Sequence, residues 1–164
     1  MTETEVLRLI DRLTEADVGF WLEGGWGVDA LLGHPTREHM DVDLVIEARD
    51  EHTVRTLLHG DGFRQILMPF TTAVHTVWQH PDGRIVDLHV IVLNSEGAGV
   101  FGDEGLFPAA GLGGVGSVAG RRVRCISPEV QVEFHRGYEV RDRDRHDVAM
   151  LCERFGLALP PEFA

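Results

Sequence analysis

The chain has 164 residues, the size of a single domain, and such a domain buries about two thirds of the surface that its unfolded chain exposes. Its formal net charge is −12 and it contains no lysine, which excludes a Walker A loop and argues against a nucleic-acid partner. No apolar run approaches the roughly 20 residues of a membrane span and the N-terminus is acidic, unlike a signal peptide, so we expect one cytoplasmic domain over residues 1–164 with no membrane partner.

The first third of the chain alternates between helical and strand patterns. Thr2 and Glu5 have the spacing of a capping box, and apolar residues then recur with helical period, which predicts a helix ending near Asp17. The elements expected after it are a strand at 19–22, a short helix at 26–32, a buried strand at 42–46 and a helix at 50–60.

The rest of the chain predicts a hairpin, a glycine-rich loop and two helices. Strands are expected at 64–68, 73–79 and 84–92, the last two joined by the turn at 80–83. Residues 97–120 are so rich in glycine that we expect a loop or flap without regular structure. A strand at 121–126 and C-terminal helices within 128–156, at 128–137 and 143–155, complete an α/β fold with helices packed on a mixed sheet.

Two patterns in the second half suggest no chemistry. The segment 111–116 satisfies the dinucleotide-binding pattern G-x-G-x-x-G, but no predicted strand leads into it and no helix follows it, which argues strongly against a dinucleotide site. Cys125 and Cys152 are too few for a disulfide framework or a cysteine metal site, so we expect both to pack as small apolar groups.

The most informative segment runs from residue 22 to 46. Asp41 and Asp43 precede the apolar run of a strand, and alternate residues of a strand point to the same face. Two parallel carboxylates repel unless a cation lies between them, and oxygen ligands suit Mg²⁺. Gly24 and Gly25 lead into the short helix, where backbone N–H groups and the helix N-terminus favour an anion. Although a bare Asp-x-Asp is usually a solvated strand entry, this context predicts metal-dependent phosphate chemistry.

A third acid is expected on the hairpin. Asp87 lies within an apolar strand, where an unpaired carboxylate is costly to bury, and His89 shares its face. The alternative is a charge on the exposed face of the hairpin. His39 lies on the same side of the strand lead-in as Asp41, so it could contact phosphate, although a lone histidine is as often a structural hydrogen-bonding group.

These motifs resemble those of the antibiotic nucleotidyltransferases, the lincosamide enzymes most closely and the aminoglycoside 2''-adenylyltransferases more distantly. The resemblance rests on Gly-Gly-Trp-Gly-Val-Asp-Ala-Leu-Leu-Gly at 24–33 and Thr-Arg-Glu-His-Met-Asp-Val-Asp at 36–43, and it continues through Val-Asp-Leu-His at 86–89 to Asp-x-x-Asp at 144–147. It covers most of the chain and is weakest at 94–120 and around 68–79. It implies a nucleotidyltransferase fold of the DNA polymerase β type, and a homodimer.

The resemblance also implies a reaction: a drug hydroxyl attacks the α-phosphorus of a nucleoside triphosphate, taken to be ATP, and pyrophosphate leaves. Asp41, Asp43 and Asp87 would hold Mg²⁺, with two ions expected, and Asp87 would also act as general base. The ATP-binding residues would be Gly24, Gly25, Arg37, His39 and Arg143. Phe70, Trp78 and Tyr138 could line the acceptor pocket, although aromatic residues are more often part of a core.

Three functions fit these observations. The first is AMP transfer to an antibiotic hydroxyl, with a lincosamide ahead of an aminoglycoside; the acidic surface suits a cationic small molecule. The second is the same chemistry on a protein, in a toxin–antitoxin pair. The third is a catalytically inactive nucleotide-binding module, against which the intact set of Asp41, Asp43 and Asp87 speaks.

Overall fold

The protein is described by a computed structural model that covers residues 1–103, 105–136 and 138–164. The helices are α1 (Glu3–Glu15), α2 (Gly24–Leu32), α3 (Glu51–Gly60), α4 (Pro128–Phe134) and α5 (Asp142–Phe155), with short 3₁₀ turns at Ala48–Asp50, Ala109–Gly113 and Pro161–Phe163. The strands are β1 (Phe20–Glu23), β2 (Asp41–Glu47), β3 (Arg64–Ile66), β4 (His75–Gln79), β5 (Ile85–Leu93), β6 (Gly99–Phe101), β7 (Gly105–Phe107), β8 (Gly114–Val118) and β9 (Arg121–Cys125).

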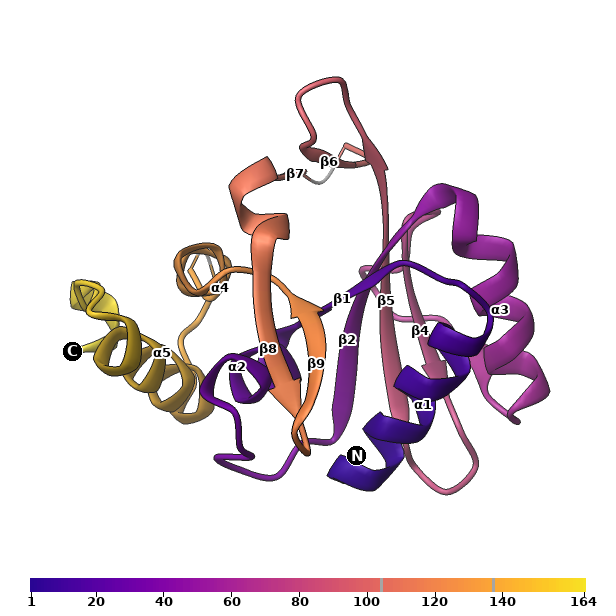
Figure 1. The fold of residues 1–164 in the computed structure, drawn as a ribbon, viewed down its shortest axis with the longest axis horizontal. Helices are drawn as coiled ribbons and strands as arrows, with labels where there is room; N and C mark the ends of the chain where they lie inside the picture. The colour runs from indigo at the N-terminus through magenta and orange to yellow at the C-terminus, as the bar shows by residue number, and fades with distance from the viewer. Residues whose placement is uncertain (104, 137) are drawn as a thin grey trace.

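The nine strands of the described residues form one sheet, and its mixed character agrees with the sequence prediction. The main order is β3-β4-β5-β2-β1-β9-β8, and β6 pairs with β5 and β7 beside this path. β2 runs parallel to β5 and β1 runs parallel to β9, whereas the β1–β2 and β4–β5 pairs are antiparallel. α1 and α3 lie to one side of the sheet in Figure 1, and α2, α4 and α5 lie to the other.

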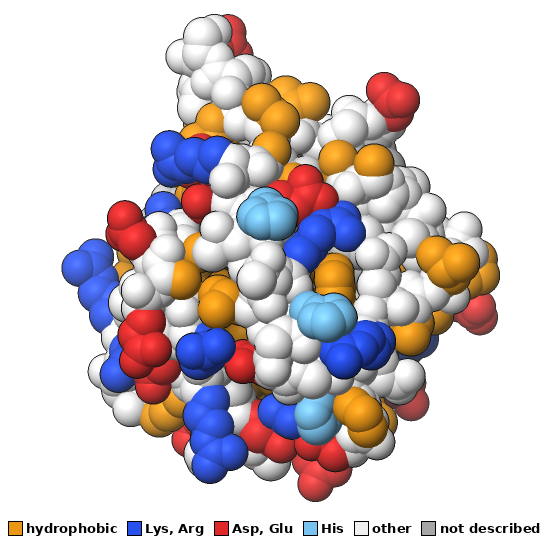
Figure 2. Space-filling model, turned by 90° about the vertical axis from the view of Figure 1, so that its right-hand side faces the viewer, with side chains coloured by type: hydrophobic (Ala, Val, Ile, Leu, Met, Phe, Trp, Pro, Cys, Tyr) orange, Lys and Arg blue, Asp and Glu red, His pale blue; other side chains and the backbone are white. Residues whose placement is uncertain are grey.

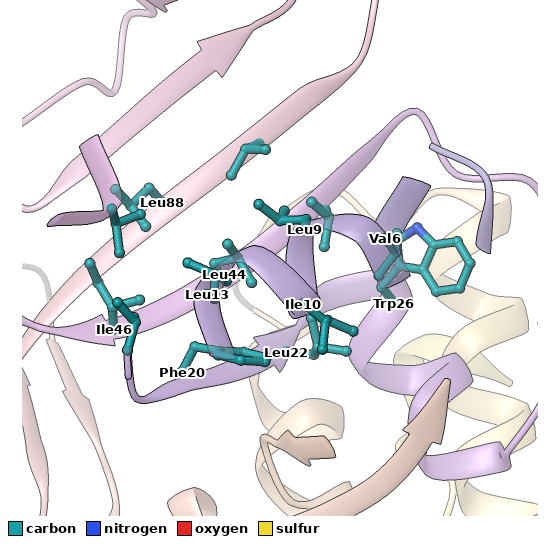
Figure 3. Close-up of a cluster of buried hydrophobic side chains, with 14 of the residues drawn as sticks. Val6, Leu9, Ile10, Leu13, Phe20, Leu22, Trp26, Leu44, Ile46 and Leu88 are labelled. Carbon is teal, nitrogen blue, oxygen red and sulfur yellow. The ribbon is translucent and has the colours of Figure 1, made fainter. Parts of the chain in front are cut away.

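The α1 side of the sheet carries the largest apolar core. The predicted capping box is present between Thr2 and Glu5, and the buried face of α1 packs on alternate residues of β1, β2 and β5 (Figure 3). The buried side chains that meet there include Val6, Leu9, Ile10, Leu13, Leu22, Leu44, Ile46 and Leu88. Because successive residues of a strand point to opposite faces, the acids between these apolar residues must lie on the other face.

The outer face beside α1 and α3 mixes arginine and acidic side chains (Figure 2). Among the described residues, no helix is long and apolar enough to cross a membrane. Both cysteines are buried and free, and burial raises the pKa of Cys125 to about 12. Trp78 belongs to the apolar core, so the suggestion that it lines an acceptor pocket is wrong.

The prediction of an irregular loop at 97–120 is wrong. β6, β7 and β8 all lie within it, together with a 3₁₀ turn at Ala109–Gly113. Glycine is used here for close packing: a Cβ at Gly116 would lie 2.2 Å from the carbonyl oxygen of Ala30, so β8 can press against α2 because it lacks a side chain there. The glycine pattern at 111–116 spans a 3₁₀ turn and β8 with no helix after it, a context unlike that of a dinucleotide site. The predicted end of the helix at 137 lies outside the described residues.

Candidate active site

Three acids from three adjacent strands form a row across the sheet. Glu23 of β1 pairs with Asp43 of β2, and Asp43 pairs with Asp87 of β5. Neighbouring strands lie about 4.8 Å apart, so the ladder fixes the spacing of these carboxylates. Asp41 precedes Asp43 by two residues and is expected on the same face. The row continues an apolar patch in which Trp21, Val45 and Ile91 pack on the face opposite α1.

The electrostatics of the row favour a cation. Asp43 is half-buried, and its pKa is raised well above the usual value by burial and then by the charge of Asp41. Asp87 and Glu23 raise the pKa of Asp43 further, while His89 lowers it. A carboxylate whose ionised form is disfavoured in this way would be stabilised by a bound cation. The donor set of carboxylate oxygens therefore fits Mg²⁺.

Gly24 and Gly25 bring the start of α2 against this row. Gly24 has φ +57°, and a Cβ there would lie 2.1 Å from the Asp43 carboxylate, so glycine is required both for the backbone conformation and for the contact. A Cβ at Gly25 would lie 2.4 Å from Nδ1 of His39 and 2.6 Å from Arg37. The first turn of α2 therefore lies directly beside the acids, where its N–H groups can meet an anion.

Arg37 and His39 are both engaged with acids in the structure. Arg37 makes a forked ion pair with Asp147 of α5, at 2.9 Å and 2.6 Å, and this hydrogen bonding raises its pKa. His39 is buried, and its Nε2 lies 2.5 Å from Oδ2 of Asp29 on α2. Phosphate binding by both residues stays a prediction, and the burial of His39 favours a structural role.

Arg143 lies on α5 with its guanidinium exposed and 4.0 Å from Asp144. Its predicted contact with the triphosphate remains a prediction. Phe70 and Tyr138 are exposed, as acceptor-lining residues would be. Phe70 lies closer to the acids, since its ring centroid is 4.8 Å from that of His75.

Asp87 sits in a hydrogen-bonded network of histidines. The Nε2 of His75 lies 2.8 Å from Oδ1 of Asp87 and 3.0 Å from Nε2 of His89. Nδ1 of His89 lies 2.8 Å from Glu23. Burial opposes protonation of His89, but the charge of Glu23, its hydrogen bond and the charge of Asp87 raise the pKa of His89 to about 9. Asp87 and His89 thus share a face, as the alternation of β5 predicted.

The sequence patterns did not identify Glu23 and His75 as site residues. The predicted hairpin could have identified His75. Its turn pairs residue 79 with residue 85, and in that antiparallel register His75 lies opposite His89. Among the residues that the structure describes, His75, Asp87 and His89 form the only group of three potential ligands whose ligand atoms lie within 4.8 Å of one another. The carboxylates of Asp41, Asp43 and Asp87 lie on the same sheet, but their oxygen atoms do not all lie within 4.8 Å of one another.

A mixed sheet with carboxylates on adjacent strands beside a Gly-Gly helix start defines a nucleotidyltransferase fold. The chain matches the family model for aminoglycoside-2''-adenylyltransferase over residues 5–151. It belongs to that family and is an adenylyltransferase.

Individual relatives agree with the assignment. The chain is 30% identical over 155 residues to a lincosamide resistance protein of Staphylococcus haemolyticus, covering 92% of this chain and 94% of the relative. The crystal structure of the lincosamide antibiotic adenylyltransferase LnuA with bound lincomycin superposes with a TM-score of 0.82 at 29% identity, covering 96% of this chain and 99% of LnuA. ANT(2'')-Ia in complex with adenylyl-2''-tobramycin shares the fold, with a TM-score of 0.72 at 21% identity over 94% of this chain and 89% of its own.

Proposed function

We propose that this protein transfers AMP from ATP to a hydroxyl group of a lincosamide antibiotic and releases pyrophosphate. The observation that carries the proposal is the set of carboxylates on one sheet face, Asp41, Asp43 and Asp87, beside the glycine start of α2. The lincosamide acceptor is supported by the relatives, because both the Staphylococcus haemolyticus protein and LnuA match nearly the whole chain. Because the proposed reaction would consume ATP, a cytoplasmic location is part of the proposal.

Asp41, Asp43 and Asp87 would hold Mg²⁺, with two ions expected. When bound, Mg²⁺ supplies charge stabilisation to the phosphate oxygens and favours in-line displacement. The residues of the chain would position the reactants: the N–H groups of Gly24 and Gly25 would face the phosphates, and Arg143 lies on α5, which packs against α2. Asp87 accepts the proton of the attacking hydroxyl, and His75, hydrogen-bonded to Asp87, holds its carboxylate in place.

An aminoglycoside is the second candidate acceptor. The family model that matches the chain is that of the aminoglycoside adenylyltransferases, and the net charge of −12 suits a cationic drug. Release of pyrophosphate from ATP and Mg²⁺ should be measured with lincomycin, with kanamycin and with neither. We expect release with lincomycin and an adenylylated product by mass spectrometry. Release with kanamycin alone would reassign the acceptor, and no release with either drug would contradict the proposed function.

Two substitutions separate metal binding from proton transfer. Asp43→Asn should abolish transfer and leave the fold intact, because the charge of Asp43 is disfavoured in the metal-free protein. Asp87→Asn should lose about a hundredfold or more in the single-turnover rate while calorimetry still detects ATP binding, since an amide cannot accept the proton. If Asp87→Asn turns over normally, the general base lies elsewhere, with His89 the first alternative.

A homodimer is also part of the proposal, and it rests on the family alone. Light scattering coupled to size-exclusion chromatography tests it directly: the 18.2 kDa chain should elute with twice its mass. A single-chain mass across the tested concentration range would contradict the dimer and leave the proposed chemistry unaffected.

A further inference from the structure

We propose that His75, Asp87 and His89 form a binding site for a transition-metal ion such as Zn²⁺, beside the carboxylates expected to hold magnesium. The three side chains come from the β4–β5 hairpin, and they meet on the face of the sheet that carries the acid row. Their ligand atoms are two imidazole nitrogens and one carboxylate oxygen.

The separations of these atoms are close to those around one bound ion. Nε2 of His75 lies 3.0 Å from Nε2 of His89 and 2.8 Å from Oδ1 of Asp87, and the third side of the triangle, from His89 to Asp87, is 3.6 Å. Metal–ligand bonds of about 2.0–2.1 Å imply neighbouring ligand atoms about 2.9–3.4 Å apart. The distance from His75 to His89 falls in this range, and the other two lie within about 0.2 Å of it, so an ion could bind after small movements of the side chains.

Nε2 of His75 faces both of the other ligand atoms. Only one proton can lie between two imidazole nitrogens that face each other at 3.0 Å, so one of them must act as acceptor. The same Nε2 of His75 also faces the Asp87 carboxylate, which accepts hydrogen bonds when ionised. An ion that displaces the proton on Nε2 of each histidine would be bound by all three ligand atoms, because metal-bound imidazole is neutral.

Glu23 supplies the outer contact that metal-bound histidines usually have. Such histidines generally donate the other ring N–H to a carboxylate, which fixes the tautomer and the ring orientation. Nδ1 of His89 lies 2.8 Å from Oε2 of Glu23, so Nε2 is the nitrogen directed at the proposed ion. The aromatic ring of Phe101 packs against both histidines, with centroid distances of 5.8 Å from His75 and 5.3 Å from His89.

The donor set determines which ion binds. Imidazole ligands suit zinc and related transition metals, whereas magnesium prefers oxygen ligands. Two histidines and one carboxylate leave further coordination positions open, as in catalytic rather than closed structural zinc sites. Because Asp87 also belongs to the expected magnesium set, an ion held by the histidines would compete for this carboxylate.

Binding should be tested on the complete chain, without ATP or antibiotic. Calorimetric titration with Zn²⁺ should show one equivalent, and Co²⁺ should give visible absorption bands of a nitrogen-ligated ion. His75→Gln and His89→Gln should each weaken binding by about tenfold or more. His80→Gln is the matched control: His80 forms a comparable pair with Asp82, at 2.6 Å, at the turn of the same hairpin, and its loss should change nothing.

Wild-type protein that binds no stoichiometric Zn²⁺, or glutamine variants that bind it as wild type does, would overturn the proposal. If the variants fail to fold by circular dichroism, the wild-type protein decides: one equivalent of Zn²⁺ should shift the ¹⁵N resonances of the imidazoles of His75 and His89, and unchanged spectra would refute the site. The result is independent of the proposed transfer reaction, which pyrophosphate release in Mg²⁺ tests separately.

Discussion

Replacing Arg37 with alanine should destabilise the fold, because a buried carboxylate loses its forked partner and keeps only the more distant His135, at 3.9 Å. Asp147 is 1% exposed, and Arg37 is its forked partner. Removing one member of a buried pair costs about 3–5 kcal/mol, and we expect about 3 kcal/mol here because the side chain of Arg37 is 23% exposed. For a domain of this size, 1 kcal/mol corresponds to about 2–4 °C, so the melting temperature should fall by roughly 6–12 °C.

The size of this effect should depend on pH. Burial alone would raise the pKa of Asp147, but hydrogen bonds from Arg37 and His135 lower it overall. In the wild type, the stability from this carboxylate is present above the unfolded pKa of about 3.9 and is lost as the pH falls through the lower folded value. In the Arg37→Ala variant, protonation of Asp147 in acid removes the buried charge that has lost its arginine partner. The difference between the two proteins should therefore be largest near neutral pH and shrink in acid.

The measurement is urea unfolding at several pH values, with Arg143→Ala as control. Arg143 lies on the same helix as Asp147, is 45% exposed and approaches Asp144 only to 4.0 Å, so its loss should cost less than about 0.5 kcal/mol. Equal losses in the two variants would refute the reasoning. So would an Arg37→Ala variant that unfolds like wild type but no longer binds ATP, which would assign the guanidinium to the triphosphate instead.

Three further predictions concern packing. Gly24→Ala should abolish transfer, because its Cβ would collide with Asp43. Gly156 is also at positive φ but has open space around it, so Gly156→Ala should keep activity and lose only about 1–2 kcal/mol of stability. Equal activity losses in the two variants would contradict this. Gln131→Met should raise stability by about 1–2 kcal/mol in urea unfolding, because both polar atoms of this buried amide lack a partner among the described residues. Leu88→Ala should lower the free energy of unfolding by about 2.7–5 kcal/mol. A smaller loss would mean that the core collapses around the cavity.

Local sequence patterns predicted most of the elements, because capping, periodicity and turn chemistry act over a few residues. The helix after Thr2 and the β4–β5 hairpin are examples. The segment 97–120 was mispredicted because glycine weakens strand propensity, while pairing with neighbours and close approach to α2 outweigh it. In that segment tertiary contacts override local preference.

The site was predictable to the extent that it lies on strands. Alternation placed Asp87 and His89 on one face, and the ladder brings Asp43 beside Asp87. The partnership of Arg37 with Asp147 was not predictable, because 110 residues separate them and no local rule relates the two. Three-dimensional packing decides whether an arginine is free to bind phosphate or is paired with an acid within the fold.

The position of the acids along the chain has a consequence for adaptation. Glu23, Asp43 and Asp87 all lie in the first 87 residues and are locked into one hydrogen-bonded ladder, whereas β6 and β7 branch from the end of β5 outside the main strand order. Under selection by a new drug, the branch can vary in length and sequence without moving the acids. Natural diversity in this fold should therefore accumulate in the branch, at positions other than Phe101 and Phe107, whose rings pack against His89 and Phe134.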